Sequence, residues 1–571
     1  MTKNPLLSTT LSLVALQLGS RLFSFGLNQL LLRSTTPQAF GVATIQLDVL
    51  RDTVLFLLRE GIRGAVVRTR STTTPSRVEI QSRLIPVLLS PLVLPIFYLF
   101  SRFSTPTSTS LLSKPTSFFS SSYSQTLFLY SLSTILELFS EPSYLTTLAS
   151  WETLTSTRVR IEGFSVVTKA LGTLVALKRL DQERALEAYG WGQLVYSLTL
   201  LLGLEYSLRK EKKEGKWKLI RQGGQKDGRY FDREIEKVGW SLTKQSIVKQ
   251  VLTEGDKLAV TKFGRVEDLG PYAVALNYGS LIARIIFQPL EESSRLYFSS
   301  LSSLLSSPSL SRTSRLSHLS LLTSHLSLLL SFYSHLSLIL ILLVPCYINP
   351  LLTLLLGPVW SQTSSPTLTT YVYSLPFLAI NGILEAGVSS FADQRWIKRS
   401  SLWFGVCTVL FAATIYGTIG QDDGNRNREG NGEEERWGSK GLVLGNIVNM
   451  GARIGFSCFF LLDFLQTQIE IAKKGEEEEE GTVKEKEKEK DELEKEKEIW
   501  TSLNPKRWGP SLMTILAFFV GGRVCRESER RWRERDLLLG GQGGGRTEGL
   551  KSFGQHLGVG VVVGLACLGV M

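Results

Sequence analysis

The sequence contains few of the residues, and none of the short motifs, on which many soluble enzymes depend. Only 4 histidines and 5 cysteines occur among its 571 residues. It contains no phosphate-binding loop G-x-x-x-x-G-K-S/T, no nucleophile elbow G-x-S-x-G, no H-E-x-x-H and no C-x-x-C. These absences argue against an ATP-driven pump. We therefore expect a protein that is not an enzyme and that has no cofactor.

The scarce cysteines and histidines also lack the spacing of a disulfide or metal site. The cysteines are scattered and most lie in apolar segments, which is typical of packing. His318, His325 and His335 share a Ser/Leu-rich segment, but no carboxylate or thiol is close to them in the sequence. We predict no metal site.

Long apolar runs, by contrast, recur from one end of the chain to the other. Hydrophobic residues make up 43% of the sequence. They gather in windows of about 18–22 residues, the length that crosses roughly 30 Å of hydrocarbon. The formal net charge of +12 lies in the loops between these windows, so it indicates membrane topology rather than a nucleic-acid partner. We predict an all-α polytopic membrane protein, in contact with membrane lipid, with about 12–14 transmembrane helices.

A polar and strongly basic segment divides the apolar windows into two groups. About six windows precede it and about six to eight follow, which predicts two pseudo-symmetric lobes around a central cavity. By the positive-inside rule, this linker and the N-terminus lie in the cytoplasm. The predicted parts are an N-terminal lobe (1–206), the basic cytoplasmic linker (207–240), a C-terminal lobe (241–468), a Glu/Lys-rich charged insert (469–508) and a C-terminal pair of short hydrophobic segments (509–571).

The last two parts fit this scheme least well. The charged insert is typical of a solvated helix or a disordered segment. The two short apolar segments flank RVCRESERRWRERD (523–536), whose positive charge would lie in the lumen if both segments crossed the membrane. Either one of them does not span, or the rest of the bundle holds the tail in place.

Two predicted helices within residues 242–298 are long enough to cross a bilayer, yet each carries a polar stripe. At about 100° per residue, the polar residues of each helix fall on one face. The stripes consist of Gln250, Glu254, Lys257 and Thr261 on the first helix and of Asn277, Arg284, Gln288, Glu291 and Arg295 on the second. A charge at mid-bilayer costs about 2.5 kcal/mol or more, so such stripes face a bundle interior or a water-filled cavity. We predict that they line a substrate pathway.

Further spans carry ionisable or amide groups on one face. In the second span, Arg51, Arg59 and Arg63 lie close to Asp48 and Asp52 on a helical wheel. Such a set can be an ion-pair network that only holds the bundle together, or it can bind substrate, and the sequence leaves both open. Three more predicted spans, at about residues 11–32, 371–391 and 441–464, carry further candidates. These are Arg21, Asn28, Asn381, Glu385, Asn449 and Arg453. Lesser candidates, more typical of interhelical hydrogen bonds, are Glu137, Glu141, Gln193 and Tyr196.

The polar helices carry a resemblance to a known family. The passages that carry it are LTKQSIVKQVLTEGDK (242–257), YAVALNYGSLIARIIFQPLEES (272–293), FGLNQLLLR with FGVATIQLDVLRDTVLFLLREGIR (25–33 and 40–63), LAINGILEA (378–386) and NIVNMGARI (446–454). In these passages the sequence resembles the eukaryotic Rft family of dolichol-linked oligosaccharide translocation proteins, within the multidrug/oligosaccharidyl-lipid/polysaccharide exporter superfamily.

The resemblance implies a substrate and a location. It implies that the chain helps to move a dolichol-diphosphate-linked, mannose-containing oligosaccharide (Man5GlcNAc2-PP-dolichol) from the cytosolic to the lumenal leaflet of the endoplasmic reticulum membrane, for protein N-glycosylation. A diphosphate requires fixed positive charge, which the arginines and Lys257 of the polar faces can provide. We expect the sugar hydroxyls to be met by Asn28, Gln250, Asn277, Gln288, Asn381 and Glu385.

Three other functions remain open at this stage. An accessory protein that binds the lipid-linked oligosaccharide without flipping it would need the same polar cavity. A cation-coupled exporter of small molecules would share the fold class. A dolichol-sugar glycosyltransferase is less consistent with the sequence, because its typical large lumenal loop after the first span is replaced here by about seven residues, STTPQAF.

Overall fold

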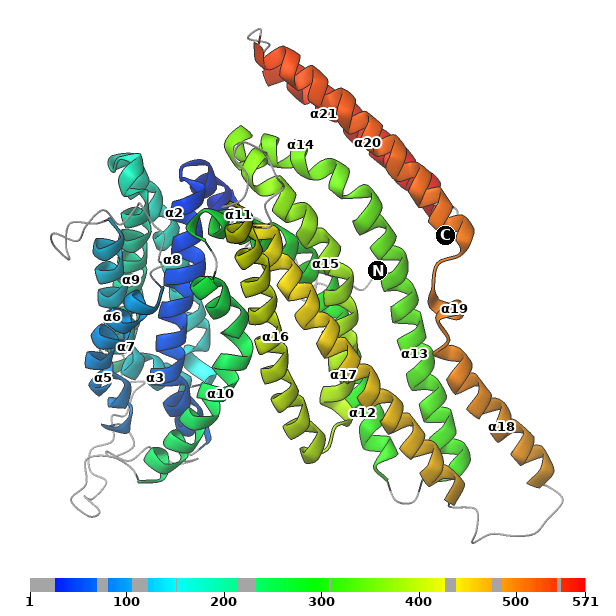
Figure 1. Cartoon of the computed structure of the whole chain (residues 1–571). Helices are drawn as coiled ribbons and strands as arrows, with labels where there is room; N and C mark the ends of the chain where they lie inside the picture. Colours follow the sequence, from blue (N-terminus) through cyan, green and yellow to red (C-terminus); the bar gives the residue numbers. More distant parts are fainter. Residues whose placement is uncertain are drawn as a thin grey trace, which may run out of the picture. The chain divides into compact units, whose positions relative to one another are not determined.

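The computed structural model describes residues 26–68, 81–104, 122–149, 151–213, 233–263, 265–307, 310–426, 438–474, 485–541 and 546–569. Every element in these ranges is a helix (Figure 1), which confirms the predicted all-α class. The chain forms two compact units, Met1–Ala273 and Val274–Met571.

The first unit is a bundle of long helices. α7 packs along α9, α9 along α8, and α3 along α10. The elements are α2 (Pro37–Gly41), η1 (Val42–Leu47), α3 (Asp48–Arg68), α5 (Ile85–Leu88), η2 (Ser90–Leu92), α6 (Val93–Ser104), α7 (Ser122–Ala149), α8 (Trp151–Arg179), η3 (Gln182–Arg184), α9 (Ala185–Lys213) and α10 (Arg233–Phe263).

Glycine allows α3 and α10 to approach closely. A Cβ atom placed on Gly61 would lie 2.7 Å from the carbonyl oxygen of Gly239 and 2.9 Å from the amide nitrogen of Thr243. Small residues permit such backbone approach between membrane helices. α10 lies in the first compact unit. The boundary at 207–240 between the two predicted lobes, which assigns residues 241–263 to the C-terminal lobe, stays a prediction.

The second unit contains the remaining helices. α15 packs against α12, α14 and α17, and α16 packs against α17. After α11 (Val266–Ile282), which begins in the first unit, the elements are η4 (Ala283–Phe287), α12 (Gln288–Leu305), α13 (Arg312–Leu338), η5 (Ile339–Leu343), α14 (Pro345–Leu356), α15 (Pro358–Phe391), α16 (Gln394–Arg426), α17 (Gly438–Lys474), α18 (Glu485–Ser502), α19 (Pro505–Trp508), α20 (Leu512–Gly541) and α21 (Arg546–Leu568).

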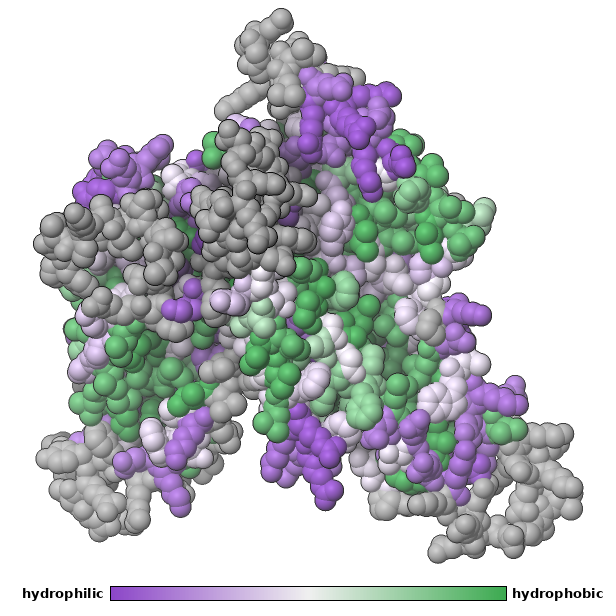
Figure 2. Space-filling view, in the orientation of Figure 1, coloured by the Kyte–Doolittle hydropathy of each residue, from purple (hydrophilic) through white to green (hydrophobic). Residues whose placement is uncertain are grey.

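Six of the described helical segments are long and apolar enough to cross a membrane. They are Val266–Leu305, Arg312–Leu343, Pro358–Phe391, Gln394–Thr418, Gly438–Lys473 and Lys551–Leu568. Large apolar side chains such as Leu328, Leu402 and Val409 are exposed on them, and Figure 2 shows wide hydrophobic areas on the molecular surface. Surfaces of this kind are suited to lipid. The chain is a polytopic membrane protein.

The six segments are fewer than the predicted 12–14 spans, and the reason is visible in the first unit. α3 and α10 are 21 and 31 residues long, but each carries several charged residues within its length. Apolar composition therefore does not identify them as spans. The total number of spans stays a prediction.

The Glu/Lys-rich insert contains a helix that is packed on one side. In α18, Glu492 is only 6% exposed and Ile499 is fully buried. The Glu492 carboxylate accepts a hydrogen bond of 2.7 Å from Thr313 Oγ1 of α13 and forms an ion pair of 3.1 Å with Arg312. Lys473 of α17 pairs with Glu496 at 2.7 Å. Only part of this helix is solvated, because α13 and α17 offer partners for its acidic face.

The C-terminal hairpin of α20 and α21 is attached to the second unit by an apolar cluster. Phe518 and Cys525 of α20 and Cys567 of α21 pack with Leu343 and Cys346. The rest of this unit therefore holds the tail in place, which is one of the two explanations that the sequence left open. The packing role predicted for cysteine is confirmed at these three positions.

Candidate functional site

In the first unit, three arginines of α3 face two glutamates of α7. Arg51 Nε donates to Glu137 Oε1 at 2.9 Å. Arg63 Nε donates to Glu141 Oε1, and its Nη2 donates to Glu141 Oε2 at 2.8 Å. Arg59 lies between these pairs, with its Nη1 at 3.7 Å from Glu137 Oε2 and at 4.0 Å from Glu141 Oε2. Both glutamates are 1% exposed, so this ion-pair ladder is buried.

The ladder follows from helix geometry. Arg59 and Arg63 are four residues apart, as are Glu137 and Glu141, so each pair projects from one face of its helix. The ring of Tyr144 covers Arg63, with the guanidinium carbon 4.0 Å from the ring centroid. Buried charges require such paired and covered surroundings, because desolvation is costly.

Asp48, at the start of α3, makes a further contact with α7 and extends this network to α8. Its carboxylate accepts a hydrogen bond of 3.2 Å from the Tyr130 hydroxyl of α7. Lys169 Nζ of α8 lies 3.5 Å from the same Asp48 oxygen. The sequence analysis did not single out Lys169 or Tyr130. The available signal for Lys169 was a lysine in the middle of the otherwise apolar predicted span at about residues 163–177.

A pocket of ≈ 290 Å³ opens beside the ladder, between α3 and α10. Gln250 Nε2 of α10 donates to Thr53 Oγ1 of α3 at 3.0 Å. Glu254 pairs with Lys257 of the same helix at 2.6 Å. The charged side chains that line the pocket are Asp52, Arg59, Glu60, Arg63 and Glu254. Three carboxylates thus face two guanidinium groups, so the pocket is not a concentrated cationic site.

In the second unit, α15 and α17 form another polar cluster. Arg453 Nη2 of α17 donates to both carboxylate oxygens of Glu385 at 3.1 Å. Asn381 Nδ2 donates to Glu385 Oε2, also at 3.1 Å. The ring of Phe404 lies 4.3 Å from the Arg453 guanidinium carbon. The buried Asn381 Oδ1 and Arg453 Nε atoms have no hydrogen-bond partner among the described residues, so the cluster has unused polar capacity.

Glu291 of α12 reaches the same cluster. A Cβ atom placed on Gly382, next to Asn381, would lie 2.9 Å from Glu291 Oε2. Glu291 Oε1 accepts from Arg295 Nη2 at 2.6 Å. The structure therefore brings together four charged or amide side chains from three helices, α12, α15 and α17, as the polar stripes predict.

Arg284 lies in the π-helical turn η4 and differs from the other arginines. Its side chain is exposed and donates to its own helix, to Ser280 Oγ at 2.5 Å and to Ser280 O at 3.4 Å. No carboxylate pairs with it within the described ranges. π-helical turns are frequent at functional sites. Arg284 is thus a charged group in a candidate span for which the described part of the chain supplies no counter-ion.

The remaining predicted residues lie outside these clusters. Gln288 is exposed and its side chain lies 3.5 Å from Glu292 Oε1, and Asn277 is half-buried one helical turn before Ser280. Asn28 and Asn449 are half-buried, the latter one turn before Arg453. Arg21 falls outside the residues that the structure describes.

The sequence matches one family model and several curated proteins. The model, described as "Rft protein", matches residues 6–479. The Man(5)GlcNAc(2)-PP-dolichol translocation protein RFT1 of Candida albicans is 33% identical over 468 residues, which cover 78% of this chain and 80% of that protein. Proteins of the same name from Schizosaccharomyces pombe and Saccharomyces cerevisiae are each 29% identical, over 79% and 78% of this chain and 82% and 81% of their own lengths. These matches, over the helices that carry both polar clusters, show that the chain belongs to the Rft family.

Proposed function

We propose that this protein moves Man5GlcNAc2-PP-dolichol from the cytosolic to the lumenal leaflet of the endoplasmic reticulum membrane, where the glycolipid serves protein N-glycosylation. The observation that carries this proposal is membership of the Rft family, whose relatives cited above are named for translocation of this glycolipid. The matched region spans about four fifths of those relatives, 80% of one and 81% of another. The proposed topology places the N-terminus in the cytoplasm, on the side of the basic segment 207–240.

The chemistry of the two units suits different parts of this substrate. The diphosphate requires a cation that the protein does not already neutralise. Arg284 meets this requirement, because its only described partners are atoms of Ser280. An arginine in a membrane span is costly unless it faces water or an anion. We therefore assign the diphosphate contact to Arg284 and not to Arg453, which Glu385 already engages.

The sugar residues require hydrogen-bond donors and acceptors rather than net positive charge. In the second unit, Asn381 and Glu385 offer amide and carboxylate groups at the same cluster. In the first unit, the pocket beside Gln250 and Glu254 combines carboxylates with guanidinium groups. Because Arg51 and Arg63 are engaged by glutamates, we assign this pocket to sugar hydroxyls and not to phosphate.

The first test is depletion of the protein in cells, followed by chromatography of the accumulated lipid-linked oligosaccharides. We expect accumulation of Man5GlcNAc2-PP-dolichol, the form that is complete on the cytosolic face and not yet extended in the lumen. An unchanged profile with normal N-glycosylation would contradict the proposal and favour a small-molecule exporter.

A second test separates direct transport from an accessory role. The purified protein is reconstituted in vesicles whose lipid-linked oligosaccharide can be detected only in the outer leaflet. We expect the inner-leaflet pool to become accessible in vesicles that contain the protein and to stay inaccessible in protein-free vesicles. Binding of the glycolipid without this change would instead identify an accessory protein.

A further inference from the structure

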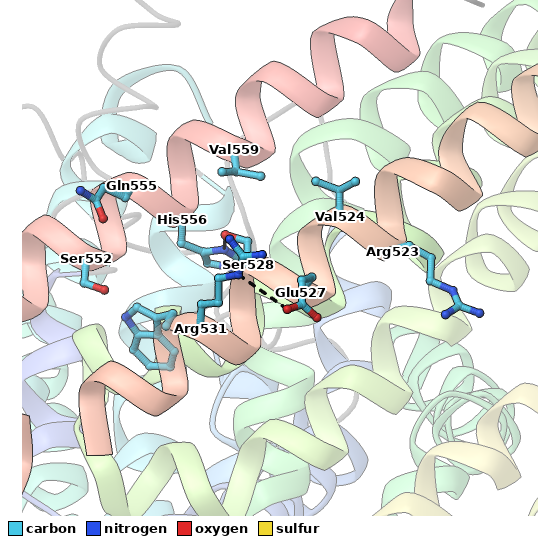
Figure 3. A pocket seen from close by; sticks show the side chains of 10 residues that line it. Arg523, Val524, Glu527, Ser528, Arg531, Ser552, Gln555, His556 and Val559 are labelled. Carbon is cyan, nitrogen blue, oxygen red and sulfur yellow. Dashed lines mark hydrogen bonds and ion pairs between the residues drawn. The ribbon is translucent and has the colours of Figure 1, made fainter. Parts of the chain in front are cut away.

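A second pocket lies in the C-terminal hairpin, beyond residue 479, where the family match ends. It has a volume of ≈ 630 Å³, which is in the range of about 300–1,000 Å³ found for small-molecule sites. α20 and α21 both contribute side chains to it, and Figure 3 shows these side chains along the groove between the two helices.

One wall of this pocket is held in place by buried hydrogen bonds. His556 of α21 is 2% exposed. Its Nε2 lies 3.0 Å from the carbonyl oxygen of Cys346 and must donate to it, while its Nδ1 lies 2.8 Å from Ser528 Oγ. The Tyr347 ring stacks on the imidazole with centroids 4.4 Å apart. The wall is therefore fixed before any ligand binds, which lowers the entropic cost of binding.

The charged lining of the pocket favours an anion. Arg523 and Arg531 contribute two positive charges against the single carboxylate of Glu527. Arg531 Nε lies 3.6 Å from Glu527 Oε1 (dashed in Figure 3), and both side chains are exposed, so this pair is weak. No carboxylate pairs with Arg523 in the described part of the hairpin, where its guanidinium lies 5.8 Å from the Phe519 ring centroid. Arginine binds phosphate oxygens in a bidentate way.

The position of the pocket indicates a ligand that belongs to the membrane. His556 lies in the first turns of the candidate span Lys551–Leu568. Beyond it, Val561, Val562 and Leu565 are between 55% and 67% exposed, so the hairpin has an apolar outer surface there. The part of α20 that contributes to the pocket lies in the charged segment 523–536, which contains six arginines and four acidic residues. A basic pocket at the edge of an apolar span is where lipid headgroups lie.

We propose that this pocket binds the phosphate headgroup of an anionic membrane phospholipid, with Arg523 and Arg531 as its cationic contacts. The phosphate chemistry is shared with free phosphate, but the apolar surface next to the pocket favours the lipid. The site is independent of glycolipid transport and would anchor the hairpin at the membrane interface.

The test is equilibrium binding of fluorescent phosphatidylserine, in mixed micelles, to the purified full-length protein. Each arginine near an anionic lipid surface contributes about fivefold in affinity. We therefore expect R523Q/R531Q to weaken binding by at least tenfold, and phosphatidylcholine to bind the wild type at least tenfold more weakly. The matched control, R526Q/R530Q, removes the same charge from exposed positions of α20 outside the pocket lining. Because Arg526 and Arg530 do not line the pocket, this variant should weaken binding less than R523Q/R531Q does.

Three results would overturn the proposal. Equal losses in the two double variants would show unspecific attraction to a basic helix. Equal affinity for the two lipids would show that the headgroup charge is not recognised. Displacement of the lipid by millimolar inorganic phosphate would show that the site serves free phosphate. R523K/R531K keeps the charge but loses the bidentate geometry of arginine, so it should show an intermediate affinity. If R523Q/R531Q does not elute as a folded protein, the lysine variant supplies the test.

Discussion

The arginines of α3 and the arginine of η4 are the same side chain in two different situations. Arg51 is 12% exposed, and its nearest partner, Glu137, is 1% exposed. Arg284 is exposed, and Ser280 is its only hydrogen-bond partner among the residues that the structure describes. The comparison teaches that a charged stripe on a membrane helix does not by itself identify a binding site. The partner of the charged group decides whether it holds the bundle together or can bind a ligand. Removing one member of a buried ion pair destabilises the bundle, whereas a charge in a span without a counter-ion requires water or an anion.

The largest effect should come from reversing the charge of Arg284, for which no counter-ion lies within the described ranges. R284E should abolish transport, because the substrate diphosphate would meet a carboxylate, and R284K should retain part of it. The thermal stability of both variants should equal that of the wild type. Complementation of depleted cells measures transport, and membrane fractionation confirms insertion.

The control for this prediction is R530E, which reverses an exposed arginine on α20. It should complement normally. Normal complementation by well-expressed R284E would contradict the assignment of Arg284 to the diphosphate.

The opposite outcome is expected for the paired region. E137Q removes the buried carboxylate that Arg51 and Arg59 share, and breaking a buried pair costs about 3–5 kcal/mol. The apparent Tm of the purified protein in detergent should fall markedly. E162Q is a matched control, because Glu162 is 38% exposed and lies 3.9 Å from Arg158; its cost should stay below about 1 kcal/mol. Equal Tm values for both variants would refute the structural role of the ladder.

The contact that places α10 on α3 can be tested by adding one methyl group. In G61A the new Cβ would lie 2.7 Å from a backbone oxygen of α10, so the helices must separate, at a cost of about 1–3 kcal/mol. In G405A the new Cβ meets no atom within 4 Å, and the gain in helix propensity is about 1 kcal/mol. Thermal unfolding should show a lower Tm for G61A and a higher Tm for G405A than for the wild type. A shift of G61A toward higher Tm would show that α10 is not held at this contact.

A small stability effect is expected at the half-exposed pair of the second unit. Arg453 and Glu385 are 27% and 32% exposed, so E385Q should cost less than about 1 kcal/mol. It should nevertheless reduce transport severalfold, because the carboxylate is assigned to sugar hydroxyls. A loss of Tm as large as that of E137Q, with transport intact, would place this pair with the structural ladder.

Periodicity predicted correctly which residues share a helix face. The four-residue spacing of Asn381 and Glu385 places both on one face of α15, where the structure has them bonded to each other. The same argument on the second span grouped Arg51, Arg59 and Arg63. It could not decide between an ion-pair network and a binding role, because that depends on what the neighbouring helix offers.

The lobe boundary illustrates another limit. The basic segment 207–240 is the clearest break in composition, yet α10, which follows it, packs into the first unit. A basic composition indicates where the chain leaves the membrane. Contact between α3 and α10 depends instead on the absence of side chains at Gly61 and Gly239, which lets the two backbones approach.

The sequence by itself determined the helical membrane class, the polar faces and the family, because apolar length, helical period and motif are all local properties of the chain. Only the tertiary structure decided which charges are neutralised. Glu137 lies 86 positions from Arg51 in the sequence, and no local pattern links the two. Their pairing is fixed by the packing of α3 against α7, whereas none of the acidic side chains that the structure describes pairs with Arg284.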